Sequence, residues 1–349
     1  MTGGAGFIGS TLSRALAPRA ARWVALDSMH PQVHRTADRP AELDDNAELV
    51  VGDVADAAVW DELLARFQPD VVIHLAAETG TAQSLSEATR HASANVVGTT
   101  AMTDAFVRWD VRPARMVLSS SRAVYGEGRW RLEDGRIVSP GQRGHAQLVR
   151  EQWGVPSATP LPSSFADTPP SPTSVYGATK LAQEHLLKAW CGAFEVDLAV
   201  LRLQNVYGVG QSLINPYTGI VSLFSQLARR GESIPVYEDG EIVRDFVYID
   251  DVVDAFRCAI ELPISGAVEG YDIGSGVATT IAELATEISR YHGAPPPHVT
   301  EQFREGDVRA AWCTVDAAEE GLGWRPHWRL DRGIAALQEW IERELTPAT

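Results

Sequence analysis

The sequence has few cysteines, few basic residues and no long apolar runs. Its three cysteines, Cys191, Cys258 and Cys313, are far apart in 349 residues and form no Cys-x-x-Cys pair, which indicates neither a disulfide framework nor a cysteine-based zinc site. No apolar run approaches the roughly 18 residues that span a bilayer. The net charge of −16 argues against nucleic acid or an anionic membrane as a partner, because phosphates would be repelled. We expect a soluble protein of the cytoplasm.

Very little precedes the glycine-rich start of the chain, MTGGAGFIGS. Gly3, Gly6 and Gly9 have the G-x-x-G-x-x-G spacing of a loop that turns from a strand into a helix beside a dinucleotide pyrophosphate. Such a loop follows a hydrophobic strand, yet only Met1 and Thr2 precede Gly3. That strand is central in the sheet, and each buried backbone group left unpaired by its absence would cost about 1–3 kcal/mol. We therefore expect further apolar residues upstream of Met1.

The first half of the chain alternates apolar strands with helices. Continuous apolar strands separated by helices are typical of a parallel sheet that is buried on both faces. The pattern predicts an α/β fold, a doubly wound Rossmann parallel sheet with a smaller C-terminal substrate-binding domain. Expected strands are 23–26, 48–54, 70–77 and 115–121, and expected helices are 7–17, 58–67 and one that carries Asn95. The predicted domains are 1–204 and 205–345, with part of 245–262 packing back on the first.

Two aspartates follow predicted strands and favour a dinucleotide. Asp27 ends the strand after the glycine loop, where a carboxylate accepts hydrogen bonds from the adenosine ribose. Its negative charge would repel a 2′-phosphate, which favours NAD over NADP. Asp53 follows the next strand and is expected near the adenine. Either aspartate could instead serve only as a loop residue.

Tyr176 and Lys180 in SVYGATK have Y-x-x-x-K spacing. Residues four apart lie on one face of a helix, and an ammonium group beside a phenol favours the phenolate and lowers the phenol pKa. Such a tyrosine can remove a hydroxyl proton while hydride leaves the attached carbon. The spacing alone is common, but Ser119, Ser120 and Ser121 end a buried parallel strand, where ligands bind in such sheets.

The chain resembles the extended short-chain dehydrogenase/reductase superfamily of NAD-dependent sugar-nucleotide epimerases and dehydratases. The resemblance is carried by TGGAGFIG, HLAA, SSSRAVYG, SVYGATK, LRLQNVYG and RDFVYIDDV, and QNVYGVGQSLINPYTGI is similar to the dTDP-L-rhamnose 4-epimerase-type branch. It implies that Ser121 is a catalytic hydroxyl, that Tyr176 is the acid/base and that Lys180 holds the nicotinamide ribose and lowers the tyrosine pKa. Further cofactor-binding residues expected from it are Phe7, Ile8, Val54, Leu75, Ala76, Ala77 and Asn95.

The resemblance also helps to distinguish between the reactions that members of this superfamily catalyse. Family dehydratases carry Thr-Asp-Glu where this chain has Ser121, Arg122 and Ala123. Alanine cannot abstract a proton and arginine cannot donate one at physiological pH, so a 4,6-dehydratase is disfavoured, as is a decarboxylase. Glu127 is an alternative base. A nucleotide-sugar 4-epimerase is expected, and a 4-ketoreductase or a non-catalytic NAD-binding sensor is the alternative.

The second half is expected to bind the nucleotide diphosphate sugar. The resemblance implies contacts from Asn205, Arg244 and Arg304, and guanidinium groups suit phosphate oxygens because they stay charged and bind in a bidentate fashion. The arginines could instead form surface salt bridges with Asp245 and Asp307. Other residues expected at the substrate are Glu78, Ser121, Arg122, Gln211 and Asn215, of which Gln211 and Asn215 could equally be ordinary loop residues.

Residues 127–172 form a long insert rich in proline, glycine and serine. A loop of this length in a compact domain is usually functional or disordered, and its position beside the predicted catalytic strand suggests that it covers the sugar. The similar epimerase branch often has a Cys-x-x-Cys-like element here, whereas this insert has no cysteine, so we expect no metal. Family members commonly pair through a four-helix bundle, which implies a homodimer.

Overall fold

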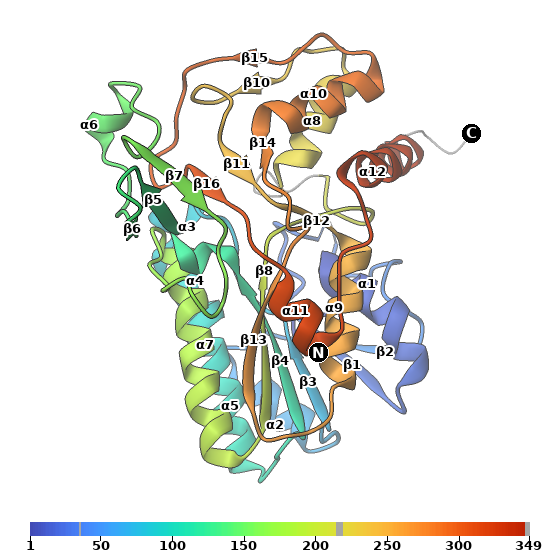
Figure 1. Ribbon diagram of the computed structural model, residues 1–349. Coiled ribbons are helices and arrows are strands. Elements are labelled where there is room, and N and C mark those ends of the chain that lie inside the picture. Colours follow the sequence, from blue (N-terminus) through green and yellow to red (C-terminus); the bar gives the residue numbers. More distant parts are fainter. Residues whose placement is uncertain (35, 214–218, 346–349) are drawn as a thin grey trace.

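Parallel strands form the centre of the larger part of the molecule (Figure 1). The computed structural model describes residues 1–34, 36–213 and 219–345. Four strands pair in the order β13-β8-β4-β3, and β1 pairs with β2, all in parallel. Their bounds are β1 (Trp23–Asp27), β2 (Ala47–Val51), β3 (Val71–His74), β4 (Arg115–Ser121), β8 (Asp197–Leu203) and β13 (Val268–Ile273).

Met1 and Thr2 lie between β1 and β3 and join the two groups of strands. Thr2 forms parallel bridges with both Leu26 and His74. Its N–H donates to the Ile73 carbonyl at 2.9 Å, and the Leu26 N–H donates to the Met1 carbonyl at 2.8 Å. Met1 and Thr2 thus form some of the backbone hydrogen bonds that a central strand would form. The expectation of apolar residues upstream of Met1 stays a prediction.

Helices cover both faces of this sheet (Figure 1). Side chains alternate along β4, so Met116 and Leu118 belong to one core and Val117 to the other. The first core includes residues of α2 (Ala57–Leu64), α5 (Gly98–Arg108) and α7 (Val175–Phe194), and the second includes residues of α1 (Phe7–Leu16) and α9 (Ile249–Glu261). Every residue of β4 and β8 is buried, so their apolar residues are consecutive, at 116–118 and 198–201, rather than alternating.

A third core holds the smaller part of the molecule together. It is formed by α8 (Ile220–Arg229), α10 (Ile281–His292) and α12 (Leu330–Leu345), with small sheets of order β10-β15 and β14-β11-β16. A reciprocal pair of hydrogen bonds between Thr280 and Glu283 begins α10. The strands are β10 (Pro235–Val236), β11 (Val243–Arg244), β14 (Thr279–Thr280), β15 (His298–Val299) and β16 (Ala310–Ala311).

The second half of the chain returns to the Rossmann sheet more than once. Helix α9 packs on it, β13 pairs with β8, and α11 (Asp316–Leu322) contributes Ala318 and Leu322 to the same core. The division at residue 205, with part of 245–262 packing back, stays a prediction; β13 and α11 are further late segments that join the first layer.

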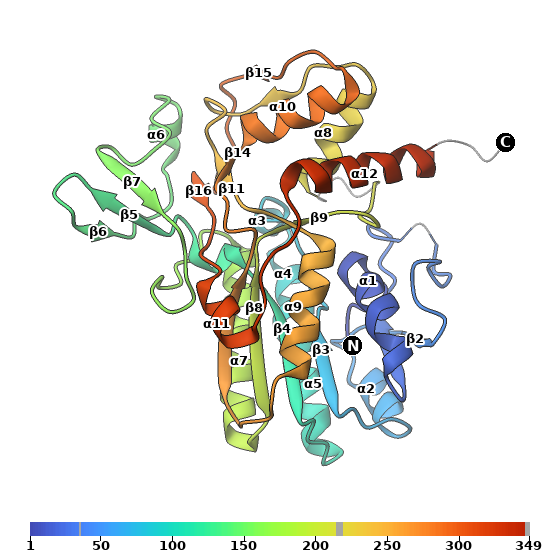
Figure 2. The ribbon, with the colours of Figure 1, turned by 45° about the vertical axis from the view of Figure 1, so that its right-hand side comes forward.

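The insert forms a small structure of its own. An antiparallel sheet of order β6-β5-β7 consists of β5 (Arg129–Leu132), β6 (Ile137–Val138) and β7 (Ala158–Leu161), and α6 (His145–Leu148) lies between β6 and β7. Figure 2 shows it projecting beside the smaller domain. The remaining elements are η1 (Ala17–Arg19), α3 (Gln83–Ser86), α4 (Ala88–Ala92), η2 (Ser93–Val97), η3 (Arg122–Tyr125), β9 (Asn205–Tyr207) and β12 (Phe246–Tyr248).

Across the described ranges, no helix combines the length and the apolar character needed to cross a membrane.

Candidate active site

The glycine loop forms a tight turn against the strand ends. Gly3 has φ +63°, and a Cβ there would lie 2.7 Å from the Ala76 nitrogen. A Cβ on Gly9 would lie 2.5 Å from the Gly3 carbonyl oxygen, so glycine at this position lets α1 approach the loop. No side chain caps the N-terminus of α1 at Gly6. Free backbone N–H groups and the positive end of the helix dipole suit a phosphate.

A cleft of about 830 Å³ opens beside this loop. The strand ends, the glycine loop and the start of α7 line it together, so segments far apart in sequence meet there. Among the predicted cofactor residues, those that line the cleft are Gly3, Gly6, Phe7, Ile8, Gly9, Asp27, Asp53, Val54, Leu75, Ala76, Ala77, Tyr176 and Lys180.

Asp27 ends β1 with its carboxylate held by the backbone. The N–H groups of Ala5 and Met29 donate to it, each at 3.0 Å, and His34 Nε2 lies 3.6 Å away. Burial alone would raise the pKa of Asp27, but the hydrogen bond with His34 and those with the two backbone N–H groups hold it below the usual value. The carboxylate is therefore charged at neutral pH. His34 was not predicted from the sequence.

Asp53 and Asn95 have mainly positioning contacts. Asp53 accepts a hydrogen bond from the Ala55 N–H at 2.8 Å. Asn95 is buried and is not among the residues lining the cleft. It accepts from the Glu78 N–H at 2.7 Å and donates to the Thr179 hydroxyl at 2.9 Å, so it connects the segment after β3 to α7. Glu78 itself lines the cleft and pairs with Arg90 at 2.7 Å.

Ser121, Tyr176 and Lys180 meet on one wall of the cleft. Ser174 caps α7 by accepting from the Gly177 N–H at 3.0 Å, so Tyr176 lies in the first turn and Lys180 one turn later. Ser121 ends β4 and lines the cleft together with Tyr176, and its hydroxyl acts to lower the pKa of that tyrosine. The arrangement brings a hydroxyl, a phenol and an ammonium to the carboxyl end of a parallel sheet, where ligands bind in this architecture.

The charges around this group set its protonation. Burial raises the pKa of Tyr176, while the hydrogen bond with Ser121 and the positive charge of Arg122 act against that rise. Burial lowers the pKa of Lys180 to about 7, and Glu184 opposes the shift. The sequence pointed to Lys180 as the cation acting on the phenol. In the structure the cation that acts on the phenol is Arg122, and the pKa of Tyr176 is raised overall rather than lowered.

Two polar side chains on the same helix as Lys180, Gln183 and Glu184, were not predicted from the sequence. Lys180 Nζ donates to the Ser119 carbonyl at 2.8 Å and to Gln183 Oε1 at 2.9 Å. Glu184 accepts from Ser120 and pairs with Arg202 at 2.7 Å. The only available signal was the spacing of Gln183 and Glu184 from Lys180, three and four residues along the same helix.

The predicted substrate residues do not all lie together. Arg122 Nε donates to Asn205 Oδ1 at 2.7 Å, and Arg244 Nη2 pairs with Asp307 Oδ1 at 2.5 Å. None of these residues lines the cleft of about 830 Å³, whereas Gln211 does. The remaining predicted positions are Arg304, which is exposed and lies 5.0 Å from the Tyr237 ring centroid, and Asn215, which falls outside the described residues.

One of the two alternative salt bridges is present. Arg244 is paired with Asp307, although it is only 4% exposed and so is not a surface residue. Asp245 instead accepts from the N–H groups of Ser275 and Gly276 at 2.6 and 3.0 Å.

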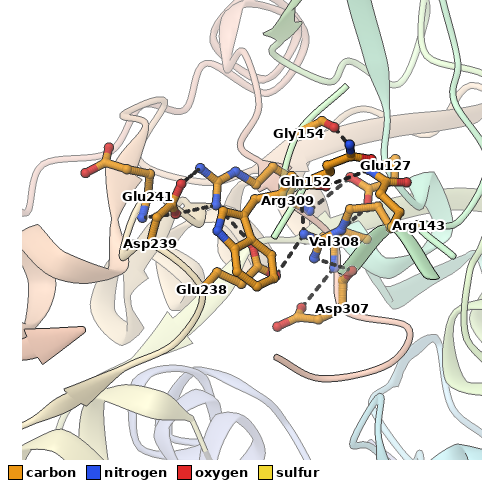
Figure 3. Close-up of polar contacts among 12 residues, drawn as sticks. Glu127, Arg143, Gln152, Gly154, Glu238, Asp239, Glu241, Asp307, Val308 and Arg309 are labelled. Atoms are coloured by element: carbon orange, nitrogen blue, oxygen red, sulfur yellow. Dashed lines mark hydrogen bonds and ion pairs between the residues drawn. The ribbon is translucent and has the colours of Figure 1, made fainter. Parts of the chain in front are cut away.

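A buried cluster fastens the insert to the smaller domain (Figure 3). We call it the Arg143 cluster and define it as Arg143, Glu127, Glu238, Asp307 and Arg309. Arg143 Nε lies 3.2 Å from Glu127 and Nη1 lies 2.8 Å from Glu238, while Nη2 donates to the Asp307 carbonyl at 2.9 Å. The Arg309 N–H donates to Glu127 at 2.9 Å. Glu127, the alternative base, is thus committed to this cluster.

Comparison with known proteins identifies the family. The model of the NAD dependent epimerase/dehydratase family matches residues 1–274. The chain belongs to this family. A dTDP-L-rhamnose 4-epimerase of Burkholderia thailandensis is 57% identical over 99% of this chain and 95% of its own length. A UDP-glucose 4-epimerase of Mycolicibacterium smegmatis is 33% identical over 99% of this chain and 98% of its own.

Solved structures agree with this assignment. The UDP-glucose 4-epimerase of Thermotoga maritima, solved with UDP-glucose, has a TM-score of 0.80 at 28% identity, covering 99% of this chain and 98% of its own. MoeE5, solved with UDP-glucuronic acid and NAD, has a TM-score of 0.75 at 28% identity, covering 99% and 98%. The predicted Rossmann fold, NAD dependence and nucleotide-sugar epimerase class are confirmed.

Proposed function

We propose that the protein inverts C4 of a dTDP-6-deoxyhexose, with dTDP-L-rhamnose as substrate. The observation that carries this proposal is the placement of Ser121, Tyr176 and Lys180 together in the cleft beside the glycine loop. Full-length identity of 57% to a dTDP-L-rhamnose 4-epimerase supports the choice of sugar.

The residues of the cleft fit NAD. Gly3 and Gly9 let the loop pack closely against the strand end and α1, because a Cβ at either position would clash with backbone atoms. The N-terminus of α1 carries no competing side-chain cap. A charged Asp27 suits ribose hydroxyls and disfavours a 2′-phosphate. When bound, NAD supplies a hydride acceptor.

Tyr176 is the proton-transfer group in this proposal. Its phenolate takes the C4 hydroxyl proton as the C4 hydrogen departs as hydride, which leaves a 4-keto sugar. After the sugar turns over, hydride returns to the opposite face and Tyr176 gives its proton back to O4. Neither a proton nor an electron is gained or lost over the cycle, so no external reductant is consumed.

Other residues would orient the substrate. We assign Ser121 to the sugar oxygen, Lys180 to the ribose of NAD, and Arg244 with Arg304 to the diphosphate, since guanidinium groups bind phosphate oxygens well. Asn205 and Gln211 would contact the nucleotide sugar. Binding of a diphosphate at Arg244 would compete with its 2.5 Å pair to Asp307.

Dehydration and decarboxylation are disfavoured for the reason found in the sequence. Arg122 and Ala123 stand where a dehydratase needs an acid and a base, and Glu127 is occupied by Arg143 and the Arg309 N–H.

Product analysis by NMR tests the proposal. The purified protein with its own bound NAD, given dTDP-L-rhamnose and no reductant, should yield the C4 epimer until equilibrium. Tyr176→Phe is the control that should bind NAD and form no product. A stoichiometric requirement for NAD(P)H would replace the epimerase with a ketoreductase, and lack of any turnover would reject the substrate.

We also propose a homodimer in the cytoplasm. Val107 of α5 is 47% exposed, and Val97, the residue before the start of α5, is 49% exposed. Exposed apolar side chains on a helix favour burial against a second copy of the chain. The three cysteines are unpaired, as is usual in a reducing compartment. Light scattering of the wild type and of Val107→Glu tests the dimer, and cell fractionation tests the location.

A further inference from the structure

Gln183 is a buried side chain of α7 that bonds the ammonium group of Lys180. It follows Lys180 by three residues, so both lie on one face of the helix, and their exposed fractions are only 0% and 2%. Lys180 Nζ donates to Gln183 Oε1 at 2.9 Å and to the Ser119 carbonyl at 2.8 Å. An ammonium group has three N–H donors, and these two acceptors are its hydrogen-bond partners within the described part of the chain. One N–H therefore remains for a ligand in the cleft, which Lys180 lines.

The orientation of the Gln183 amide is fixed by the groups on its other side. Gln183 Nε2 donates to the Thr99 hydroxyl oxygen at 2.9 Å. That hydroxyl donates its own hydrogen to the Asn95 carbonyl at 2.6 Å, so its oxygen can only accept from the amide. Because an ammonium group only donates, the amide oxygen has to face Lys180 and the NH2 group has to face Thr99. A flipped amide would place donors against donors at the lysine.

His74 and Thr2 extend this contact to the glycine loop. His74 Nε2 lies 2.9 Å from the Thr99 hydroxyl oxygen and 3.1 Å from Gln183 Nε2. Its Nδ1 lies 2.7 Å from the Thr2 hydroxyl oxygen. Burial lowers the pKa of His74 to about 3, so the ring is neutral at physiological pH and brings no charge to the lysine. Since Thr2 directly precedes Gly3, a buried chain of polar contacts joins the start of the glycine loop to the lysine.

We propose that Gln183 is a positioning residue of the cofactor site, which holds the Lys180 ammonium so that its third N–H stays available to the nicotinamide ribose of NAD. The inference rests on the proposed function, in which Lys180 holds this ribose. Gln183 is not among the residues that line the cleft, so it acts through the lysine rather than on the dinucleotide. A buried ammonium that loses an acceptor turns toward another one or gives up its proton, and either change would weaken its contact with the ribose.

Binding of NAD and of ADP tests this role without turnover. The two ligands share the adenosine and the diphosphate, but ADP lacks the nicotinamide riboside. Gln183→Met keeps the length of the side chain and removes the amide, so we expect NAD to bind about tenfold more weakly, as for one lost bond to a charged group, and ADP to bind as before. Gln183→Glu keeps the acceptor oxygen and should restore most of the NAD affinity. Calorimetry on the full chain measures both affinities. Equal losses for NAD and ADP, or no loss for either, would overturn the proposal.

Gln338→Met is the matched control. Gln338 is another glutamine that is 0% exposed, and its amide bonds Ser225 of α8 and His292 of α10 in the third core. The variant should lower stability but leave the ratio of NAD affinity to ADP affinity unchanged, and a shift as large as that in Gln183→Met would count against the proposal. Circular dichroism shows whether each variant is folded. Gln183→Asn, whose side chain is one methylene too short to bond both partners, takes the place of Gln183→Met if the latter is not folded.

A double variant separates this inference from the proposed function. Lys180→Met should weaken NAD more than ADP, and adding Gln183→Met to it should change the ratio no further, because the glutamine acts through the lysine. A wild-type ratio in Lys180→Met would show that the lysine does not hold the ribose, and the inference would fall with that assignment. In turnover, Gln183→Met should lower kcat about tenfold and leave KM for the sugar unchanged. If the wild type converts no dTDP-L-rhamnose, the proposed substrate fails, and the affinity ratio still decides the role of Gln183.

Discussion

The cleft wall that we assign to the dinucleotide and the residues that we assign to the sugar side, called here the dinucleotide wall and the sugar wall, are held by different kinds of contact. The dinucleotide wall depends on backbone: Gly3 and Gly9 allow close approaches, and Asp27 is fixed by N–H groups. The sugar wall depends on ion pairs between distant segments, such as Arg244 with Asp307 and Arg143 with Glu238. A wall built from close backbone contacts tolerates few substitutions, so it keeps the same ligand. A wall built from paired side chains can be changed by substitution, which alters the substrate that it binds.

Tyr176 lines the cleft and is the proposed proton-transfer group, so its removal should have the largest effect. Tyr176→Phe deletes the proton-transfer group but keeps the ring, and kcat should fall by about 10³-fold. NAD content should stay unchanged because the glycine loop is untouched. Kinetics and bound-NAD analysis measure both. Retained turnover would remove the phenol from the mechanism.

Gly3→Ala should break the dinucleotide wall alone. The added Cβ would meet the Ala76 nitrogen at 2.7 Å in a residue whose φ is +63°, so we expect NAD affinity to fall at least about tenfold from conformational strain. Gly135→Ala is the control, because φ there is +85° with nothing within 4 Å of a Cβ. Equal NAD affinity in the two variants, measured by calorimetry, would contradict the close approach.

Arg143→Met should break the sugar wall alone. Removing this 5% exposed arginine takes one cation from the buried Glu127 and Glu238 and leaves them only Arg309 within the Arg143 cluster. This loss should lower the unfolding free energy by about 3 kcal/mol and raise KM for the nucleotide sugar. NAD affinity should be unaffected. Arg136→Met in the same insert removes an exposed pair with Asp134 and should change stability by less than about 1 kcal/mol. Matching denaturation midpoints for the two variants would argue against the Arg143 cluster.

Asp27→Asn should have the smallest effect of these variants, and it tests which dinucleotide the dinucleotide wall selects. The variant keeps the size of the side chain and loses its charge, so we expect about tenfold weaker NAD binding, as for one charged hydrogen bond, and relatively better binding of NADP. Affinities for both dinucleotides measure the ratio. A ratio that does not move would show that the carboxylate does not select the cofactor.

The fold was largely predictable because its signals are local. Apolar runs such as residues 70–77, DVVIHLAA, indicated the parallel strands, and the glycine spacing indicated the turn into α1. The return of β13 and α11 to the first layer was not predictable, because nothing in residues 268–273 or 316–322 marks which sheet they join. That choice depends on which buried edge is free once the other strands have paired.

The amino-acid sequence alone determined the chemistry that repeats at short range: the turn at Gly3, Gly6 and Gly9, and the one-turn separation of Tyr176 and Lys180. Only the tertiary structure decided the charges around them. Arg122 is bonded to Asn205, and the Arg143 cluster joins segments that are far apart in the chain. Electrostatic interactions act through space and carry no periodicity along the sequence, so these pairings emerged only with the fold.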